Sequence, residues 1–86
     1  MAKQIQPKQT VQHLGREQAL ELQKKVSLSS FFEQGKEWRM FYAHDLKAGY
    51  YGEDGKKEER EFGHPLEASQ YFNQIRSQWI QEHNIR

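Results

Sequence analysis

The segment EWRMFYAH, residues 37–44, constrains the fold more than any other part of the sequence. Large apolar side chains recur there with a period of two, at Trp38, Met40 and Tyr42, and the intervening set contains the ring of Phe41. Aromatic side chains favour the pleated surface of a sheet, and alternation is typical of a strand. The segment therefore predicts a β-strand.

Two turns are predicted to fold the following chain back on this strand. The first is DLKAG, residues 45–49, which we expect to place His44 opposite Gly49. The second is Asp54-Gly55, a strong signal for a two-residue hairpin because both residues tolerate the positive φ of a type I′ turn. A hairpin centred there pairs Tyr51 with Glu58.

These registers sort the side chains of the predicted meander onto two faces. One face is apolar and consists of Trp38, Met40, Tyr42, Tyr51 and Phe62. The opposite face carries Arg39, Phe41, Ala43, Tyr50, Lys57, Glu59 and Glu61. The run KKEEREF, residues 56–62, becomes the outer strand, where its charges discourage pairing with another chain.

Helical patterns flank the meander in the sequence. Residues 15–26, GREQALELQKKV, are strong helix formers with apolar side chains on one side, and residues 27–35, SLSSFFEQG, predict a brief second helical turn or a packed loop. The final helix is predicted to start at His64-Pro65 and to end near Glu82. Its apolar stripe, expected to cover the apolar face of the sheet, consists of Ala68, Tyr71, Phe72, Ile75 and Trp79.

The predicted fold class is therefore α+β. A short N-terminal helix, a three-stranded antiparallel meander and a long C-terminal amphipathic helix packed on one sheet face form two layers. Residues 1–12 are polar and carry Lys3 and Lys8, so they are predicted to be a flexible basic tail. Residues 13–86 are predicted to be a single domain.

Composition limits the chemistry of the chain. The 13 Lys and Arg residues nearly balance the 12 Asp and Glu residues, and cysteine is absent. A cysteine-free chain without an apolar leader or an apolar run of about 18 residues suits the cytoplasm and predicts no membrane segment.

Catalytic and metal-binding patterns are also missing from the sequence. The four histidines do not follow HxxxH or HExxH spacing, and His44 and His64 are interpreted as a turn residue and a helix-entry residue. The carboxylates of the predicted hairpin alternate with lysines on a surface expected to be exposed, which gives no reason to expect the pKa tuning that catalysis needs. We therefore expect no enzymatic activity, no metal and no cofactor.

Two kinds of binding surface are predicted. A protein partner would meet the sheet face, and the candidate residues are Arg39, Phe41, Tyr50, Lys57 and Glu59. The glutamine-rich outer side of the final helix is a second candidate. Aromatic and arginine side chains are the usual anchors of such surfaces. The alternative is that the first helix simply covers Phe41.

The second hypothesis is that the partner is a nucleic acid. Residues 1–25 hold five Lys and Arg against two Glu, and the candidate contacts are Lys3, Lys8, Arg16, Lys24 and Lys25. The strands and helix over residues 38–76, with a Trp-initiated first strand and FGHPLEA at the start of the helix, resemble the three-stranded DNA-reading domains of some phage integrases and plant AP2-type factors. That resemblance implies a sheet that enters the major groove. The third strand departs from it, because Glu58, Glu59 and Glu61 would repel phosphates.

The sequence thus favours a small non-enzymatic binding or regulatory module that acts through a protein partner. Nucleic-acid binding is the alternative, and the oligomeric state is left open.

Overall fold

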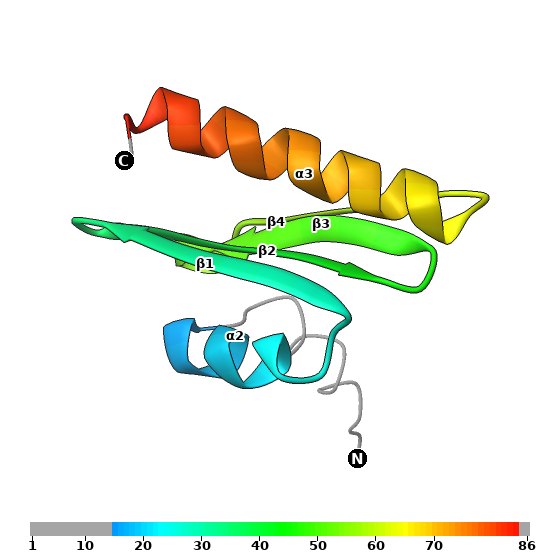
Figure 1. Ribbon diagram of the computed structural model, residues 1–86. Helices are drawn as coiled ribbons and strands as arrows, with labels where there is room; N and C mark the ends of the chain where they lie inside the picture. The colour runs from blue at the N-terminus through cyan, green and yellow to red at the C-terminus, as the bar shows by residue number, and fades with distance from the viewer. Residues whose placement is uncertain (1–14, 85–86) are drawn as a thin grey trace, which may run out of the picture.

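The computed structural model describes residues 15–84, which form three layers: a helix, a sheet and a second helix (Figure 1). The sheet is an antiparallel meander of four strands in the order β1-β2-β3-β4. The elements are α2 (Arg16–Gln23), β1 (Leu28–Gln34), β2 (Glu37–His44), β3 (Lys47–Gly52), the 3₁₀ turn η1 (Glu53–Gly55), β4 (Lys57–Glu61) and α3 (Pro65–Glu82). The predicted α+β class is confirmed. Within residues 15–84, no helix is long and apolar enough to cross a membrane.

The prediction of three strands was wrong, because residues 28–34 form a fourth strand. Gly35, at φ 61°, is the first residue of the two-residue loop that joins β1 to β2. A strand sends the adjacent rings of Phe31 and Phe32 to opposite faces of the sheet. Phe31 stacks on Trp38 at 5.8 Å between ring centroids, and Phe32 stacks on Trp79 at 5.5 Å. Two adjacent phenylalanines that each need a core are better served by a strand than by a turn of helix.

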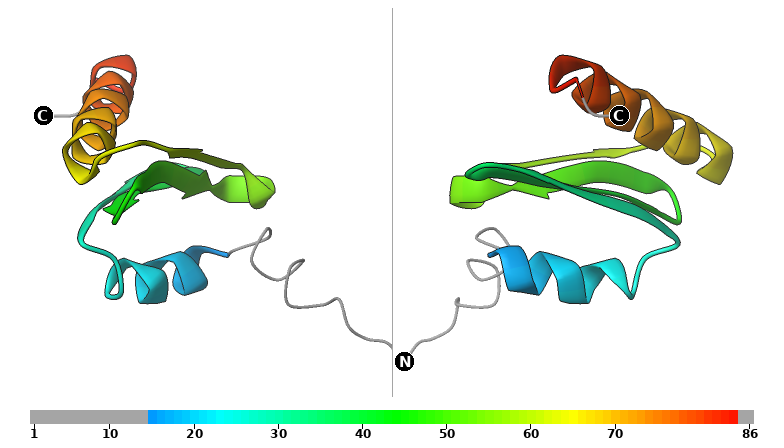
Figure 2. Two further views of the ribbon diagram at one scale, coloured as in Figure 1. Left: turned by 90° about the vertical axis from the view of Figure 1, so that its right-hand side faces the viewer. Right: turned by 60° about the vertical axis from the view of Figure 1, so that its left-hand side comes forward.

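The two helices cover opposite faces of the sheet, so the two-layer prediction was also wrong (Figure 2). Trp38, Met40, Tyr42 and Tyr51 do share one face, as predicted, but α2 packs on it through the fully buried Ala19. The final helix lies on the other face. Its buried side chains, with the residues they pack against, form a second cluster made of Phe41, Ala43, Ala48, Ala68, Phe72 and Trp79.

The turn registers explain which side chains changed face. The first turn is shorter than predicted, since His44 pairs with Lys47 rather than Gly49. That shift of two residues leaves every side chain on its predicted face. In the second hairpin Tyr51 pairs with Lys57 rather than Glu58, and a shift of one residue moves the whole outer strand to the opposite face.

The second turn is longer than a two-residue hairpin because Glu53 is held within it. The Glu53 carboxylate accepts a hydrogen bond from the Trp38 backbone N–H at 3.1 Å and pairs with Lys56 at 2.9 Å. Asp54 and Gly55 then take the positive φ values, 58° and 76°. As a result Phe62 packs against Tyr71 of α3, at 5.4 Å between ring centroids, instead of joining the face of Trp38.

The start and end of α3 agree with the sequence. His64 is the N-cap, and its Nδ1 accepts a hydrogen bond from the Leu66 N–H at 3.0 Å, while Pro65 occupies the first helical position. The helix ends at Glu82, as predicted.

Replacing the buried ring at the centre of α3 should unfold much of the protein. Phe72→Ala is expected to cost about 3–5 kcal/mol, because it leaves a cavity beneath the helix. That cost is a large part of the stability of so small a domain. Chemical denaturation followed by circular dichroism would measure it, with the exposed neighbour Asn73→Ala as the control. A Phe72→Ala protein that unfolds at the same midpoint as Asn73→Ala would contradict the packing of α3.

Candidate functional site

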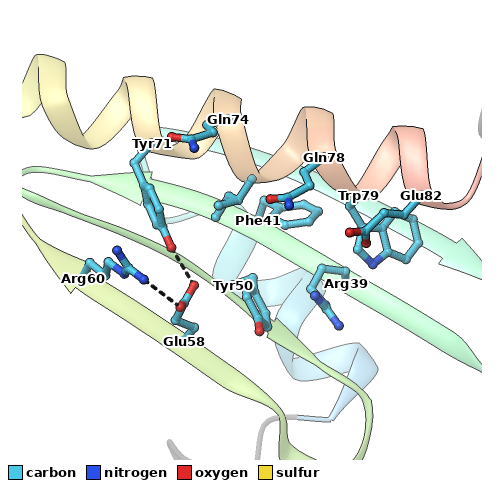
Figure 3. Close-up of a pocket in the computed structure, with 11 residues that line it drawn as sticks. Arg39, Phe41, Tyr50, Glu58, Arg60, Tyr71, Gln74, Gln78, Trp79 and Glu82 are labelled. Atoms are coloured by element: carbon cyan, nitrogen blue, oxygen red, sulfur yellow. Dashed lines mark hydrogen bonds and ion pairs between the residues drawn. The ribbon is translucent and has the colours of Figure 1, made fainter.

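An open groove of about 420 Å³ runs between one side of α3 and strands β3 and β4 (Figure 3). It exists because α3 covers only part of the sheet face on which it packs. Its lining residues come from β2, β3, β4 and α3, and they are Arg39, Phe41, Tyr50, Glu58, Arg60, Tyr71, Gln74, Ile75, Gln78, Trp79 and Glu82.

Arg39 is the most unusual residue of the groove. Its guanidinium carbon lies 4.1 Å from the centroid of the Tyr50 ring, a close cation–π contact. The Nε atom is buried without a hydrogen-bond partner among the described residues, and it packs against Gly52, where an added Cβ would lie 3.1 Å away. No carboxylate of residues 15–84 forms an ion pair with Arg39. Packing therefore fixes this cation in place while its charge stays without a counterion in that part of the chain.

The opposite wall of the groove is built from three side chains that satisfy one another. The Tyr71 hydroxyl donates to Glu58 at 2.7 Å, and Arg60 lies 3.5 Å from the other oxygen of that carboxylate. Arg60 also lies over the Tyr71 ring at 5.1 Å. Burial, with the hydrogen bond to Glu58, raises the pKa of Tyr71 to about 12, so the hydroxyl keeps its proton at neutral pH. This wall offers little net charge to a ligand.

The groove as a whole is neither basic nor acidic. Two arginines, Arg39 and Arg60, face two glutamates, Glu58 and Glu82, so the formal charges of the lining cancel. Aromatic and apolar side chains form its base, and glutamine amides lie on its rim (Figure 3). That composition is typical of protein interfaces, whereas affinity for nucleic acids depends on an excess of cations.

The structure separates the predicted protein-binding residues. Arg39 and Tyr50 are brought together in the groove, but Phe41 is 1% exposed and lies beneath α3, not beneath the first helix.

Lys57 and Glu59 lie on the opposite face of the sheet. Lys57 is 5.4 Å from the Tyr51 ring, and Glu59 accepts a hydrogen bond from the Tyr42 hydroxyl at 2.5 Å. Burial, and then that hydrogen bond, raises the pKa of Tyr42 far above its ordinary value. The five residues therefore do not form one surface.

The predicted nucleic-acid contacts are only partly described. Arg16 donates two hydrogen bonds to Glu33, at 2.9 and 3.0 Å, and Lys24 lies 3.5 Å from Glu21. Lys25 is exposed and forms no ion pair with residues 15–84. Lys3, Lys8 and the predicted tail of residues 1–12 lie outside the described residues. The sheet face that would enter a groove of DNA in the resembling domains is covered here by α2.

The sequence pattern indicated some groove residues and missed others. Gln74 and Gln78 belong to the glutamine-rich side of the final helix, and Tyr71 belongs to its apolar stripe, so helical periodicity was a usable signal for these three. Glu58 and Arg60 were assigned to the wrong face by the one-residue error in the second hairpin.

A second hollow lies at the other end of α3, and it contains a serine–histidine contact. The Ser27 hydroxyl and His44 Nδ1 are 3.2 Å apart, both on exposed side chains, and Leu28 and Leu66 line the same hollow. Catalytic serine–histidine pairs need a third group that orients the ring. Among residues 15–84, nothing bonds the other nitrogen of His44, and no cluster of three metal-binding side chains occurs. The contact is therefore not treated as a catalytic site.

Comparisons with protein-family models, curated proteins and solved structures found no match. Function is therefore inferred from the groove.

His83 packs against Trp79 at one end of the groove. Its Nε2 lies 2.9 Å from the Glu37 carboxylate, its Nδ1 lies 3.0 Å from the Trp79 carbonyl, and its ring stacks on Trp79 at 3.8 Å. Both ring nitrogens face acceptors, and only the imidazolium can donate to both. Hydrogen bonding to Glu37 and then to the Trp79 carbonyl raises the pKa of His83 above its ordinary value.

A raised pKa gives this contact a defined pH dependence. The contribution of the His83–Glu37 contact to the free energy of unfolding should be complete below the ordinary histidine pKa of about 6.5. It should be lost as pH rises through the higher pKa of His83 in the folded protein. An NMR titration of the histidine ring protons should show a midpoint for His83 above about 6.5. Glu37→Gln should lower that midpoint, and Glu33→Gln, on the same hairpin, should not. Equal midpoints in the parent and in Glu37→Gln would refute the assignment.

Proposed function

We propose that this protein is a small non-enzymatic protein-binding module, and that the groove beside α3 takes a segment of another protein. The observation that carries the proposal is Arg39, whose guanidinium carbon lies 4.1 Å from the centroid of the Tyr50 ring and which forms no ion pair among residues 15–84. A carboxylate on the partner is the natural counterion, because guanidinium groups bind carboxylates through two parallel hydrogen bonds.

The rest of the lining supports a peptide segment as the ligand. Gln74 and Gln78 each provide an amide that can donate to and accept from a peptide backbone. Tyr50 and Tyr71, which are both partly exposed, offer aromatic surface, which contributes strongly to the energy of protein interfaces. Contacts within the groove already hold Arg39 against Tyr50 and Tyr71 against Glu58, so binding would not have to order these side chains.

Nucleic-acid binding has weaker support. The formal charges of the groove cancel, and Arg16 is already engaged by Glu33. On the sheet face that α2 covers, strand β4 carries Glu59 and Glu61, which would repel a phosphate backbone. A cytoplasmic location belongs to the same proposal and rests on the absence of cysteine from all 86 residues.

Paired substitutions on α3 test the groove. Gln74→Glu with Gln78→Glu adds negative charge to the groove and repels a carboxylate of the partner, whereas Gln70→Glu with Gln81→Glu changes exposed residues of the same type elsewhere on the same helix. Glutamate and glutamine have similar helix propensities, so both double variants should fold like the parent. In affinity capture from the host after nuclease treatment, the affinity of the groove variant for its protein partner should be at least about tenfold lower than that of the parent, which corresponds to about 1.4 kcal/mol. Equal capture by the two double variants would refute the groove as the site.

Nucleic acid is tested directly with a labelled random duplex and a labelled single strand. We expect no binding at micromolar concentrations in about 0.15 M salt, because the groove lacks an excess of cations. Micromolar or tighter binding that is abolished by charge reversal at Lys3 and Lys8 would replace the protein-binding proposal with the alternative.

A further inference from the structure

The two edges of the sheet differ sharply in charge. Strand β4 reads KEERE and is charged at every position, whereas β1 reads LSSFFEQ and carries a single charge, Glu33. Charged side chains on an edge strand prevent pairing with other chains, and a long uncharged edge invites it. The outer strand β4 is thus protected, as the sequence predicted, but β1 is not.

The free edge of β1 has backbone groups in a defined pattern. Gln34 and Glu37 close the two-residue loop between β1 and β2, so they form a hydrogen-bonded pair, and such pairs alternate along an antiparallel ladder. Leu28, Ser30 and Phe32 then bond to β2. The N–H and C=O groups of Ser29, Phe31 and Glu33 point outward. Within residues 15–84, no other strand pairs with this edge.

Apolar side chains gather at the same edge. Leu28, in β1, is 42% exposed, and Leu66, in the first turn of α3, is 59% exposed. They are the only large apolar side chains classed as exposed among the described residues, and both line the hollow beside the start of β1. Burying them would remove apolar surface from water.

We propose that β1 pairs in antiparallel orientation with β1 of a second copy of this chain, which would give one continuous eight-stranded sheet. A second copy fits because the edge is complementary to itself: its outward donors and acceptors match in a two-fold arrangement, and its single charge does not face itself. This inference is independent of the groove beside α3.

Several symmetric registers use the outward groups, and the two compared are centred on Phe31, which pairs the whole strand, and on Ser30. The first places Leu28 opposite Gln34 of the second copy. The second places Leu28 opposite Phe32 of the second copy, on the face of α3, so that two apolar side chains meet on each side of the axis. The chemistry favours the register centred on Ser30.

This register also brings two like charges together. Arg76 donates to the Ser30 hydroxyl at 3.0 Å and lies 5.9 Å from the Phe32 ring. The two Arg76 guanidinium groups would lie near the axis, and salt screens such repulsion. Association should therefore strengthen as salt is raised, in contrast to binding driven by opposite charges.

The full chain tests the pairing by sedimentation and by cross-linking. We expect a monomer–dimer equilibrium with dimer present at about 100 μM, because the pairing of two strands forms a small interface of modest affinity. Because the parent has no cysteine, Ser30→Cys provides a single thiol at the axis, where the two Cβ atoms would approach to a distance that a disulfide can bridge. Under oxidation Ser30→Cys should dimerise faster than Glu61→Cys, although Glu61 is exposed on the charged edge.

A third variant blocks the edge without touching the β1–β2 ladder. Ser29→Pro removes an outward N–H, a position where proline is tolerated on an edge strand, and it should reduce dimerisation at least about tenfold. If this variant unfolds, the cysteine comparison decides alone. A chain that stays monomeric at about 100 μM, as it would if residues 1–14 occupied the edge, overturns the proposal. A dimer in which Glu61→Cys cross-links as fast as Ser30→Cys overturns it as well.

Discussion

Strand β2 carries large apolar side chains on both of its faces, and the rest of the structure depends on covering both. Trp38, Met40 and Tyr42 point to one side, while Phe41 points to the other, and all four are buried. A strand with one apolar face can leave its other face in water, but this one cannot. The short helix α2 and the long helix α3 therefore lie on opposite sides of the sheet, and neither could be removed without exposing aromatic surface (Figure 2).

The position of α3 follows from the same constraint and creates the candidate site. The helix lies over the two central strands, β2 and β3, where Trp79 packs against Phe41 and against Phe32 of β1, and the groove stays open on the side of β4. The outer strand comes close to β3 at Gly49, where an added Cβ would lie 1.9 Å from the Glu58 carbonyl oxygen. A glycine at that point lets β4 bring Glu58 to the hydroxyl of Tyr71.

Local patterns predicted the elements well and their partners poorly. The period of EWRMFYAH and the His64-Pro65 helix start depend on neighbouring residues, so both could be read from the sequence. The loop Glu53–Gly55 could not, because its length depends on a contact between Glu53 and the Trp38 backbone, 15 residues away. That single extra residue moved Glu58 and Arg60 into the groove and removed Lys57 and Glu59 from the predicted patch. Strand β1 was missed for a related reason. The adjacent Phe31 and Phe32 break the alternation of apolar and polar residues that is typical of a strand, and a strand accommodates both only because each face of the sheet is covered by a helix.

The most direct test of the double-sided core is to find which helix each face of β2 contacts. In a NOESY spectrum, the Phe41 ring should show cross-peaks to Trp79, whose ring centroid is 6.3 Å away, and Trp38 should contact residues of α2 such as Ala19. Cross-peaks from Trp38 to Trp79, with none from Phe41 to Trp79, would place α3 on the opposite face and contradict this account.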